Sequence, residues 1–560
     1  MMKLNQSIKK FSPRGLQLMA VGICTGMLVG VVVTFYNIAA DIITKYSQHL
    51  YDGIRENPAF VPLLFAVLAL SAFAIGTLIH FIPMVRGSGI PQTEGASRGY
   101  LHMKWYQVLP AMAAASLYCM FCGLTAGAEG PSLFIGGSCG DVVTRVMGGS
   151  DMERRYQITG GACAGLAVAF NAPLTGIVFA FEEAHRRFTP SIFICSFSSV
   201  LAALITRNLL FTALGKTVEQ VFLNFTFFHE LPLITYLYVA LAAVVSGLFG
   251  VGFYKLGLLA RKLFSKFTAL KGTAKFLVPF LFAGVAGLIT TYTIGGGHGL
   301  IEALGTLGGN EAISLKAVFS SPIVVTLIVI IVLRLISTVL NLGTGVPCGI
   351  FIPMLALGAC VGALVSQLCV AMGMEKIYTD CIVMISMATF FTSVVKAPLT
   401  SIIMVVELTW QFTLLIPVIL GVSIGYMISE LFKMKPLYDV LLEGIMEEGH
   451  VKLRRRSYVT AIETGSVAMG QAIRDVLWPG NLLIRSIKRD GTLIVPASDT
   501  VLLAGDEITV QAETTDIEHL KRCVDEIVKP HRDSLISNIK ALFAKMHKKA
   551  ETPSEEVVED

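Results

Sequence analysis

Apolar runs of membrane-spanning length constrain this chain more than any other feature. A helix needs about 20 apolar residues to cross the hydrocarbon core of a bilayer. Clear runs of this kind are Leu16–Ile43, Phe60–Phe81, Leu231–Tyr254, Phe276–Tyr292 and Pro322–Leu342. Because 54% of the 560 residues are hydrophobic and only 15% are charged, the sequence excludes a soluble enzyme. It predicts an all-α polytopic membrane protein in which other, shorter helices are broken by Gly and Pro.

Basic residues predict which side of the membrane each connection occupies. Residues 1–15 and 255–275 carry Lys and Arg but no acidic residue. Such segments lie in the cytoplasm by the positive-inside rule. The connection 214–232, which contains Lys216, Glu219 and Glu230, is therefore predicted to lie outside. The basic segment Lys452–Arg456 follows the last span and places the C-terminus inside as well.

One carboxylate lies in an otherwise apolar, glycine-rich stretch, residues 127–140. Glu129 is flanked by Gly127, Gly130 and Pro131, which break a helix and leave backbone N–H groups able to face an anion. An ionisable group at membrane depth is costly and usually functional. We therefore consider a gate, in which the side chain occupies the site that a permeant anion also binds. A packing loop with a solvated glutamate is the alternative, and this stretch alone does not separate the two.

An internal repeat links the two halves of the membrane region. Asn171–Glu182 aligns with Lys396–Glu407, with Ala, Pro, Leu, Thr, Ile and Glu recurring at matching positions. If each half crosses the membrane an odd number of times, repeat 16–214 and repeat 231–445 are inverted relative to each other. Inverted repeats with broken helices bring helix N-termini together near the midplane, where they bind anions. This argument favours the functional interpretation of Glu129.

Three further polar positions each allow two interpretations. Ser88 follows Gly87 at a helix break and is either a hydroxyl donor to a ligand or an ordinary N-cap. The pair Glu182-Glu183 at a helix end is either functional or solvated and paired with the following arginines. Tyr438, just after a span, is either a phenolic donor or an interfacial anchor.

Several chemistries find no support in the sequence. Cys119 and Cys122 form a lone C-x-x-C in an apolar run and are interpreted as packing residues, not a metal or redox site. His229-Glu230 lacks the second histidine of a zinc-protease helix. The net charge of +5 gives no argument for nucleic-acid binding. We predict no metal and no cofactor.

The composition changes after residue 445. Residues 457–525 are predicted to form a small cytoplasmic α/β module, with a hairpin turn at Asp490-Gly491. Its expected strands are Tyr458–Ile462, Leu482–Ile487, Thr492–Val495 and Glu507–Gln511, and its expected helix is Gly470–Leu477. Residues 530–560 are charged, end in an acidic tail and are predicted to be disordered.

Over residues 15–445 the chain resembles the CLC family of chloride channels and chloride/proton exchangers. The resemblance is carried by three loop motifs, a late tyrosine at 438, and Asn-Ala-Pro-Leu followed by Glu-Glu at 182–183, all in the family's order. The loop residues are Gly87, Ser88, Gly89, Ile90 and Pro91; Gly127, Ala128, Glu129, Gly130 and Pro131; and Gly349, Ile350, Phe351, Ile352 and Pro353.

The resemblance implies a homodimer in the membrane lipid, with one pore in each subunit and chloride and protons as substrates. The hydroxyls of Ser88 and Tyr438 and the backbone N–H groups of Ile350 and Phe351 would hold the chloride. Serine at position 88 favours chloride over nitrate or fluoride.

Two acidic residues receive separate roles from the same resemblance. Glu129 would be the external gating glutamate and Glu183 the internal proton-transfer glutamate. Because both are present, we expect a chloride/proton exchanger. The alternative is a passive voltage- or proton-gated chloride channel, although channel members commonly lack the acidic residue at the position of Glu183. A membrane enzyme would need a nucleophile–base pair in the spans, which we do not find.

The chain departs from the family pattern at two positions. Ala128 stands where arginine is usual, which we expect to lower anion capture from outside, and Cys348 stands where glycine is common. The tail resembles the C-terminal module of potassium-uptake and potassium-channel regulators (RCK C-terminal, TrkA-C-like) at 489–491, 495–496 and 504–506. The resemblance implies a prokaryotic protein of the cell (inner) membrane and an unidentified small ligand for the module.

Overall fold

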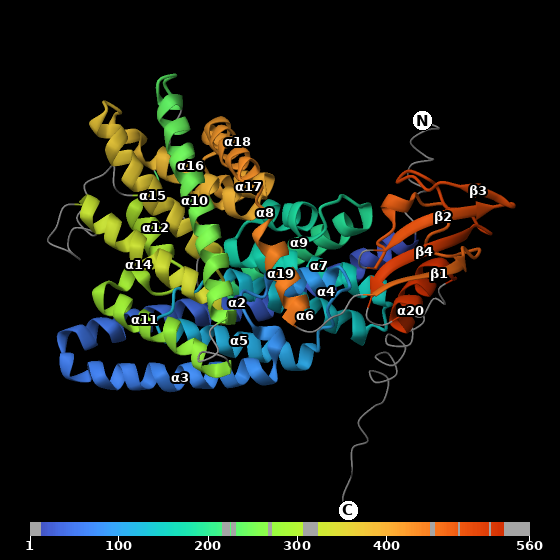
Figure 1. The fold of residues 1–560 in the computed structure, drawn as a ribbon, viewed down its shortest axis with the longest axis horizontal. Helices are drawn as coiled ribbons and strands as arrows, with labels where there is room; N and C mark the ends of the chain where they lie inside the picture. The colour runs from blue at the N-terminus through green and yellow to red at the C-terminus, as the bar shows by residue number, and fades with distance from the viewer. Residues whose placement is uncertain are drawn as a thin grey trace, which may run out of the picture.

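The computed structural model describes residues 13–215, 225, 231–266, 272–305, 323–448, 454–479, 482–514 and 517–530. Helices form one large body, and a small β-sheet module lies at one end of it (Figure 1). Most of the basic N-terminal segment, most of the connection 214–232, part of the basic loop 255–275, Lys452 and the tail 531–560 lie outside the described residues.

The predicted polytopic helical architecture is confirmed. Among the described residues, nine helices are long and apolar enough to cross a membrane. The first half contains α2 (Pro13–Glu56), α3 (Val61–Phe81), α4 (Ile90–Ser97), α5 (Trp105–Phe121), α6 (Glu129–Val146), α7 (Asp151–Phe170), α8 (Pro173–Phe179, continued by a π turn Ala180–Ala184) and α9 (Pro190–Ala213). The second half contains α10 (Thr235–Lys266), α11 (Leu277–Ile289), α12 (His298–Leu304), α14 (Ile323–Thr344), α15 (Phe351–Ala371), α16 (Thr379–Val395), α17 (Pro398–Thr409), α18 (Leu415–Leu431) and α19 (Leu437–Glu448).

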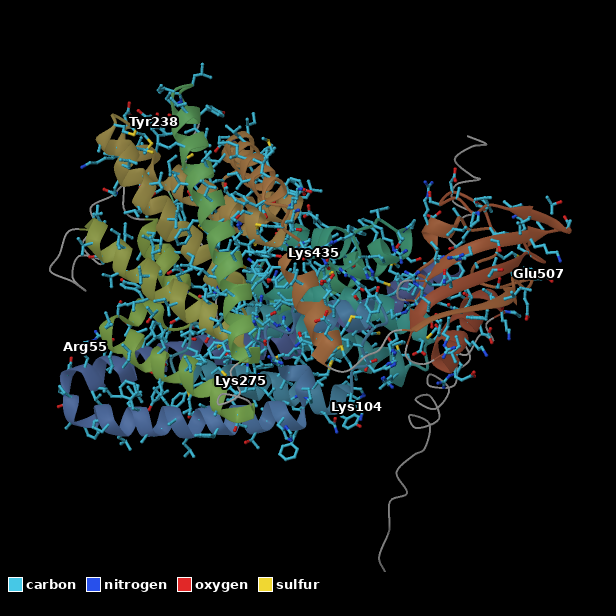
Figure 2. All side chains as sticks on the ribbon, viewed as in Figure 1. Arg55, Lys104, Tyr238, Lys275, Lys435 and Glu507 are labelled. Atoms are coloured by element: carbon cyan, nitrogen blue, oxygen red, sulfur yellow. The ribbon has the colours of Figure 1, made fainter. Side chains whose placement is uncertain are left out.

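Helix α16 lies at the centre of the second half. Every residue of α16 is buried, as expected of a helix that is apolar on all sides. It packs against α10, α15 and α18. Figure 2 shows Arg55 and Tyr238 on the side away from the β module and Lys104 and Lys435 nearer to it.

The internal repeat has a structural counterpart in the way α8 and α17 begin. Asn171 and Lys396 each end the preceding helix in the left-handed conformation, with φ of 53° and 65°. Pro173 and Pro398 then occupy the first helical position, where the missing N–H costs nothing.

The glutamate that closes each repeat caps the helix of the other repeat. Glu407 accepts hydrogen bonds from Leu174 N at 2.9 Å and from Thr175 N at 2.8 Å. Glu182 accepts the equivalent bonds from Leu399 N at 2.8 Å and from Thr400 N at 2.6 Å. These N–H groups lie in the first turn of a helix and have no intrahelical acceptor. Glu182 is therefore a helix cap, and the interpretation of it as a solvated or arginine-paired group is wrong.

The C-terminal module is a four-stranded antiparallel sheet with strand order β1-β4-β2-β3. The predicted strands are confirmed, and a helix follows them: β1 (Arg454–Ala461), β2 (Leu483–Arg489), β3 (Thr492–Ile494), β4 (Glu507–Thr514) and α20 (Ile517–Val528). The hairpin turn at Asp490-Gly491 has positive φ at both residues, as the sequence pair predicts. The α-helix predicted at Gly470–Leu477 is wrong.

Long-range pairing replaces that predicted helix. Gly470 N donates to Leu502 O at 2.8 Å, and Ala472 forms an isolated bridge with Val501. The backbone there bonds to a neighbouring segment, so only a short 3₁₀ turn at Ile473–Asp475 remains.

The module contacts the membrane body at the start of α7. The Arg155 guanidinium donates to Leu477 O at 2.8 Å and to Trp478 O at 3.2 Å. The backbone N–H of Asp151 donates to a Glu526 carboxylate oxygen at 2.9 Å. Figure 1 shows α20 and the sheet beside the end of the helical body that holds α7.

Candidate functional site

The two halves of the membrane region meet at a pair of glycines. Gly127 N donates to Gly349 O at 2.8 Å, and Gly349 N donates to Gly127 O at 3.0 Å. A Cβ at Gly349 would lie 2.5 Å from the carbonyl oxygen of Gly127, so a side chain there would force the bridge apart. Helices α6 and α15 begin directly after this bridge, at Glu129 and Phe351. The structure thus brings two broken-helix N-termini together.

The loop around Ser88 joins the same centre. Gly87 and Gly89 both have φ of 83°, and Gly89 is the N-cap of α4. Gly87 N donates to Gly345 O at 3.0 Å. A Cβ at Gly130 would lie 2.6 Å from the carbonyl oxygen of Ser88, which places this loop against the first turn of α6.

Ser88 is not the N-cap of α4. Its side chain is buried, and Ser88 Oγ has no hydrogen-bond partner among the described residues. A buried hydroxyl without a partner is costly unless a ligand satisfies it.

Tyr438 has the same property, because its ring is fully buried and Tyr438 Oη lacks a partner in the described part of the chain. The interpretation of Tyr438 as an interfacial anchor is wrong.

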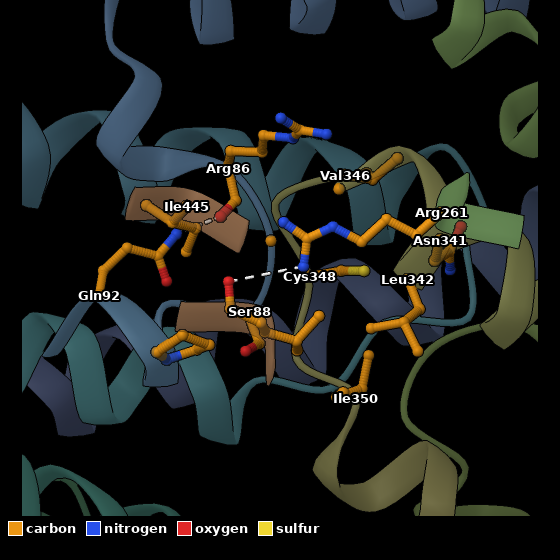
Figure 3. A pocket seen from close by; sticks show the side chains of 14 residues that line it. Arg86, Ser88, Gln92, Arg261, Asn341, Leu342, Val346, Cys348, Ile350 and Ile445 are labelled. Carbon is orange, nitrogen blue, oxygen red and sulfur yellow. Dashed lines mark hydrogen bonds between the residues drawn. The ribbon is translucent and has the colours of Figure 1, made fainter. Parts of the chain in front are cut away.

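Ser88 and Ile350 line one cavity, shown in Figure 3. Two further residues line the same cavity: Arg261, near the C-terminal end of α10, and Ile445, near the C-terminal end of α19. Arg261 Nη1 lies 3.5 Å from Leu441 O, and its guanidinium lies in the middle of the view. The cavity therefore connects the Ser88 loop with the C-terminal ends of two helices.

The backbone at the start of α15 is fixed by aromatic packing. Ile350 is the N-cap and Phe351 the first residue of the helix. The Phe351 ring lies between the rings of Phe170 and Phe391, with centroids 5.2 and 4.4 Å away. The first N–H groups of a helix have no intrahelical acceptor, so this N-terminus is a preorganised anion partner.

Glu129 lies against the glycine bridge. Its side chain is 2% exposed, which excludes the interpretation as a solvated glutamate. A Cβ at Gly127 would lie 2.2 Å from Glu129 Oε2, so only glycine leaves room for the carboxylate. Glu129 Oε2 has no hydrogen-bond partner among the described residues, whereas Oε1 lies 3.1 Å from His298 Nε2.

Glu183 lies at the end of the π turn that continues α8. It is buried, and its Oε1 has no hydrogen-bond partner in the described residues. Arg98 donates to the backbone oxygens of Glu183, at 2.9 Å, and of Ala184, at 2.7 Å. Arg98 and Arg186 both pair with Asp439, at 3.1 and 2.6 Å. One interpretation of Glu182-Glu183 is that the two carboxylates form ion pairs with the arginines that follow them. The structure instead pairs Arg186 with Asp439, the residue directly after Tyr438.

The sequence interpretation missed several residues of the site. Glu94 of α4 is buried, 3.6 Å from Arg98, and belongs to the same cluster as Glu183. Arg334 is fully buried in α14 and donates to the carbonyl oxygens of Tyr292 and Gly296. A lone arginine inside an apolar run was a usable signal for Arg334. His298 carried no such signal, because nothing in its local sequence points to Glu129.

The fold and site define a membrane transport protein built from two repeats around a central pair of helix N-termini. The sequence model described as voltage gated chloride channel matches residues 68–430, and that of the TrkA-C domain matches residues 460–523. The chain therefore belongs to the voltage gated chloride channel family and carries a TrkA-C domain at its C-terminal end. The predicted resemblance to CLC proteins and to the TrkA-C-like module is confirmed.

Relatives of the chain are named as exchangers. The H(+)/Cl(-) exchange transporter ClcA of Vibrio parahaemolyticus is 31% identical over 463 residues, covering 80% of this chain and 94% of that protein. ClcA of Yersinia pseudotuberculosis is 30% identical over 429 residues, covering 75% of this chain and 85% of that protein. The crystal structure of a slow cyanobacterial Cl-/H+ antiporter superposes with a TM-score of 0.67 at 24% identity, covering 78% of this chain and 99% of that one, and supports the fold.

Proposed function

We propose that this protein is a secondary active transporter that exchanges chloride for protons. In this proposal Glu129 is the external gate and Glu183 is the internal proton-transfer group. One observation carries it: a buried carboxylate, Glu129, lies at the junction of two helix N-termini, and a second buried carboxyl, Glu183, lies apart from it in the π turn that continues α8. The naming of the relatives as H(+)/Cl(-) exchangers supports it.

Chloride binding follows from the polar groups gathered at this junction. Moving a bare anion to the middle of a bilayer costs at least several kcal/mol. The N–H groups of Ile350 and Phe351 and the hydroxyls of Ser88 and Tyr438 replace the water of the ion. The buried hydroxyl oxygens without partners support this assignment. Because these groups are dipoles and not full charges, the ion is held weakly enough to leave.

Protonation of Glu129 couples the two substrates. The ionised carboxylate competes with chloride for the positive potential of the helix N-termini. When it takes up a proton it loses that attraction and vacates the site, so that chloride replaces it. Glu183 then exchanges the proton with the cytoplasm along a route separate from that of the anion.

Coupled flux in proteoliposomes tests the proposal. A chloride gradient should drive protons uphill through the intact protein. Glu129→Gln should abolish proton movement and leave chloride flux, because glutamine keeps the shape but carries no exchangeable proton. Glu183→Gln should also stop proton movement. A Glu129→Gln protein that still pumps protons would overturn the proposal.

A passive channel of the same fold is the competing function. It predicts currents that reverse at the chloride equilibrium potential, with no proton flux. The buried Glu183 argues against it, because a channel has no need for an acidic group at that depth. The same flux measurement therefore decides between the two.

Assembly and topology complete the proposal. We infer a homodimer in the cell membrane, with both termini in the cytoplasm. Large apolar side chains are exposed on α8, α9, α17 and α18, among them Leu174, Leu209, Leu399 and Ile416, as they are on α2, α3 and α10, and we propose the first four helices as the subunit interface. Cysteine cross-linking across these helices in native membranes tests it.

The TrkA-C domain would bind a small ligand that changes the rate of transport. Comparing the flux through a protein truncated after residue 445 with that through the full chain would test this.

A further inference from the structure

His298 lies between Glu129 and the outer solution. The imidazole Nε2 lies 3.1 Å from Glu129 Oε1. The His298 side chain is 42% exposed, whereas that of Glu129 is only 2% exposed. The ring therefore contacts the buried carboxylate on one side and water on the other. In the proposed topology α11 leads outward from the cytoplasmic loop 255–275, which puts α12 and His298 on the external side.

The segment that presents His298 is held in place by long-range bonds. Gly297 is the N-cap of α12 with φ of 110°, in the left-handed region that favours glycine. Arg334 donates to the carbonyl oxygens of Tyr292 and Gly296. Gly295 N donates to Leu124 O at 3.0 Å, just ahead of the Glu129 loop. The imidazole is thus positioned by the same framework that positions Glu129.

We propose that His298 is the external proton relay of Glu129. The proposal rests on the function proposed above and adds the route by which protons reach the gate. The imidazolium transfers its Nε2 proton to Glu129 Oε1, which leaves a neutral ring and a neutral carboxylic acid. After the carboxylic acid moves away, the ring takes a proton from external water and is charged again. In the reverse cycle each proton follows the same path outward.

Histidine is suited to this step because its pKa lies near neutrality, so the ring both gives and accepts a proton at physiological pH. A fixed cation would hold the carboxylate without protonating it. Ala128, next to Glu129, has no charge, whereas arginine is usual at that position in the family. Protonated His298 therefore supplies the positive charge beside Glu129 that this arginine would supply.

The charged groups around the ring favour its protonated form. Glu302 lies one turn further along α12, and Asp41, on α2, pairs with Lys45 at 2.9 Å. Burial lowers the pKa of His298, but the hydrogen bond to Glu129 and the carboxylates of Glu302 and Asp41 outweigh it and raise that pKa. Arg334 faces the loop from α14, and α15, against which α12 packs, contributes only cysteines as titratable groups.

Three variants separate a relay from a merely structural histidine. His298→Gln keeps a polar side chain without a titratable proton, His298→Arg keeps a positive charge without a proton to give near neutral pH, and His49→Gln removes another exposed histidine at the outer end of α2. Chloride-driven proton transport is measured in proteoliposomes as external pH is varied from about 5 to 8, on both sides of the ordinary pKa of histidine. The full-length protein is used throughout.

We expect His298→Gln to slow coupled turnover by about tenfold, because positioned acid–base groups contribute at least this much when water replaces them poorly. In His298→Gln, coupled turnover should depend less on external pH near neutrality, and His298→Arg should not restore this pH dependence. His49→Gln should behave like the parent protein. Full rescue by His298→Arg, or an unchanged pH profile in His298→Gln, would overturn the relay.

The Glu129→Gln background distinguishes the two proposals. There chloride flux no longer depends on protons, so adding His298→Gln should change neither the rate nor its pH profile. Normal chloride flux in this double variant also shows that the protein folds. If Glu129→Gln alone still moves protons, the proposed function fails. If Glu129→Gln behaves as expected and His298→Gln is silent, only the relay fails.

Discussion

Glu129 and Glu183, the two carboxyl groups of the proposed exchange mechanism, are buried in different ways. Glu129 shares a hydrogen bond with a half-exposed imidazole, so one movable side chain separates it from water. For Glu183, Arg98 donates a hydrogen bond to the backbone oxygen, and the carboxyl Oε1 has no hydrogen-bond partner among the described residues. In the proposed mechanism, the acid that moves therefore has a polar partner that it can leave, whereas the acid that stays in place has its main chain fixed.

Beyond the two carboxyl groups themselves, the largest effect is expected at Arg98, next to Glu183. This residue donates to the carbonyls of Glu183 and Ala184 and to Asp439, so it joins the end of α4 to α8 and α19. Arg98→Ala should reduce proton flux by about tenfold or more, because small displacements of a reacting group are costly. Chloride flux measured in the same vesicles should fall less.

Arg98→Lys is the matched control for this prediction. Lysine keeps the charge but cannot reach three acceptors in a planar fork, so it should restore only part of the proton flux. External pH dependence should be unchanged in both variants, because His298 and Glu129 are not touched. An Arg98→Ala protein with an unaltered proton-to-chloride ratio would contradict the view that a fixed backbone matters at Glu183.

A smaller effect is expected at Glu182, the neighbour of Glu183 in sequence. Glu182 caps α17, so Glu182→Gln should lower the free energy of unfolding by about 1–2 kcal/mol. Coupling should survive, in contrast to Glu183→Gln, which should lose coupling and keep stability. Thermal unfolding in detergent and vesicle flux measure the two properties. Glu407→Gln, at the equivalent position of the other repeat, should match Glu182→Gln; loss of coupling in either variant would break the distinction.

The smallest effect is expected far from both carboxyl groups, in the TrkA-C domain. Hydrogen bonds from Arg489 hold the pKa of Asp506 below its ordinary value. A lowered folded-state pKa stabilises the domain above the unfolded pKa, and this contribution is lost as pH falls through the folded value, below about pH 4. Asp506→Asn should therefore cost about 1 kcal/mol or less at neutral pH. Hydrogen exchange of the sheet measures it, and a pH-independent difference between parent and variant from pH 7 to 3 would contradict it.

The class of this protein can be predicted from its amino-acid sequence. Length and spacing of the apolar runs require membrane helices, and the glycines and prolines require breaks in them. The repeat of Asn171–Glu182 at Lys396–Glu407 pointed to two related halves, and their reciprocal caps are its physical expression. Glu129 stood out because an ionisable group is rare in such apolar surroundings, whereas Ser88 and Tyr438 were assigned only through the resemblance to the family's motifs.

The pairing of these groups depends on the packing of segments that are distant in the sequence. His298 lies 169 residues after Glu129, and Asp439 lies 341 residues after Arg98, so no local pattern predicts either pair. The expected helix at Gly470–Leu477 failed for the same reason, because its backbone bonds to a distant segment. Local sequence sets where a helix begins and breaks, but hydrogen bonds between distant residues form only when packing of the two halves brings them within about 3 Å.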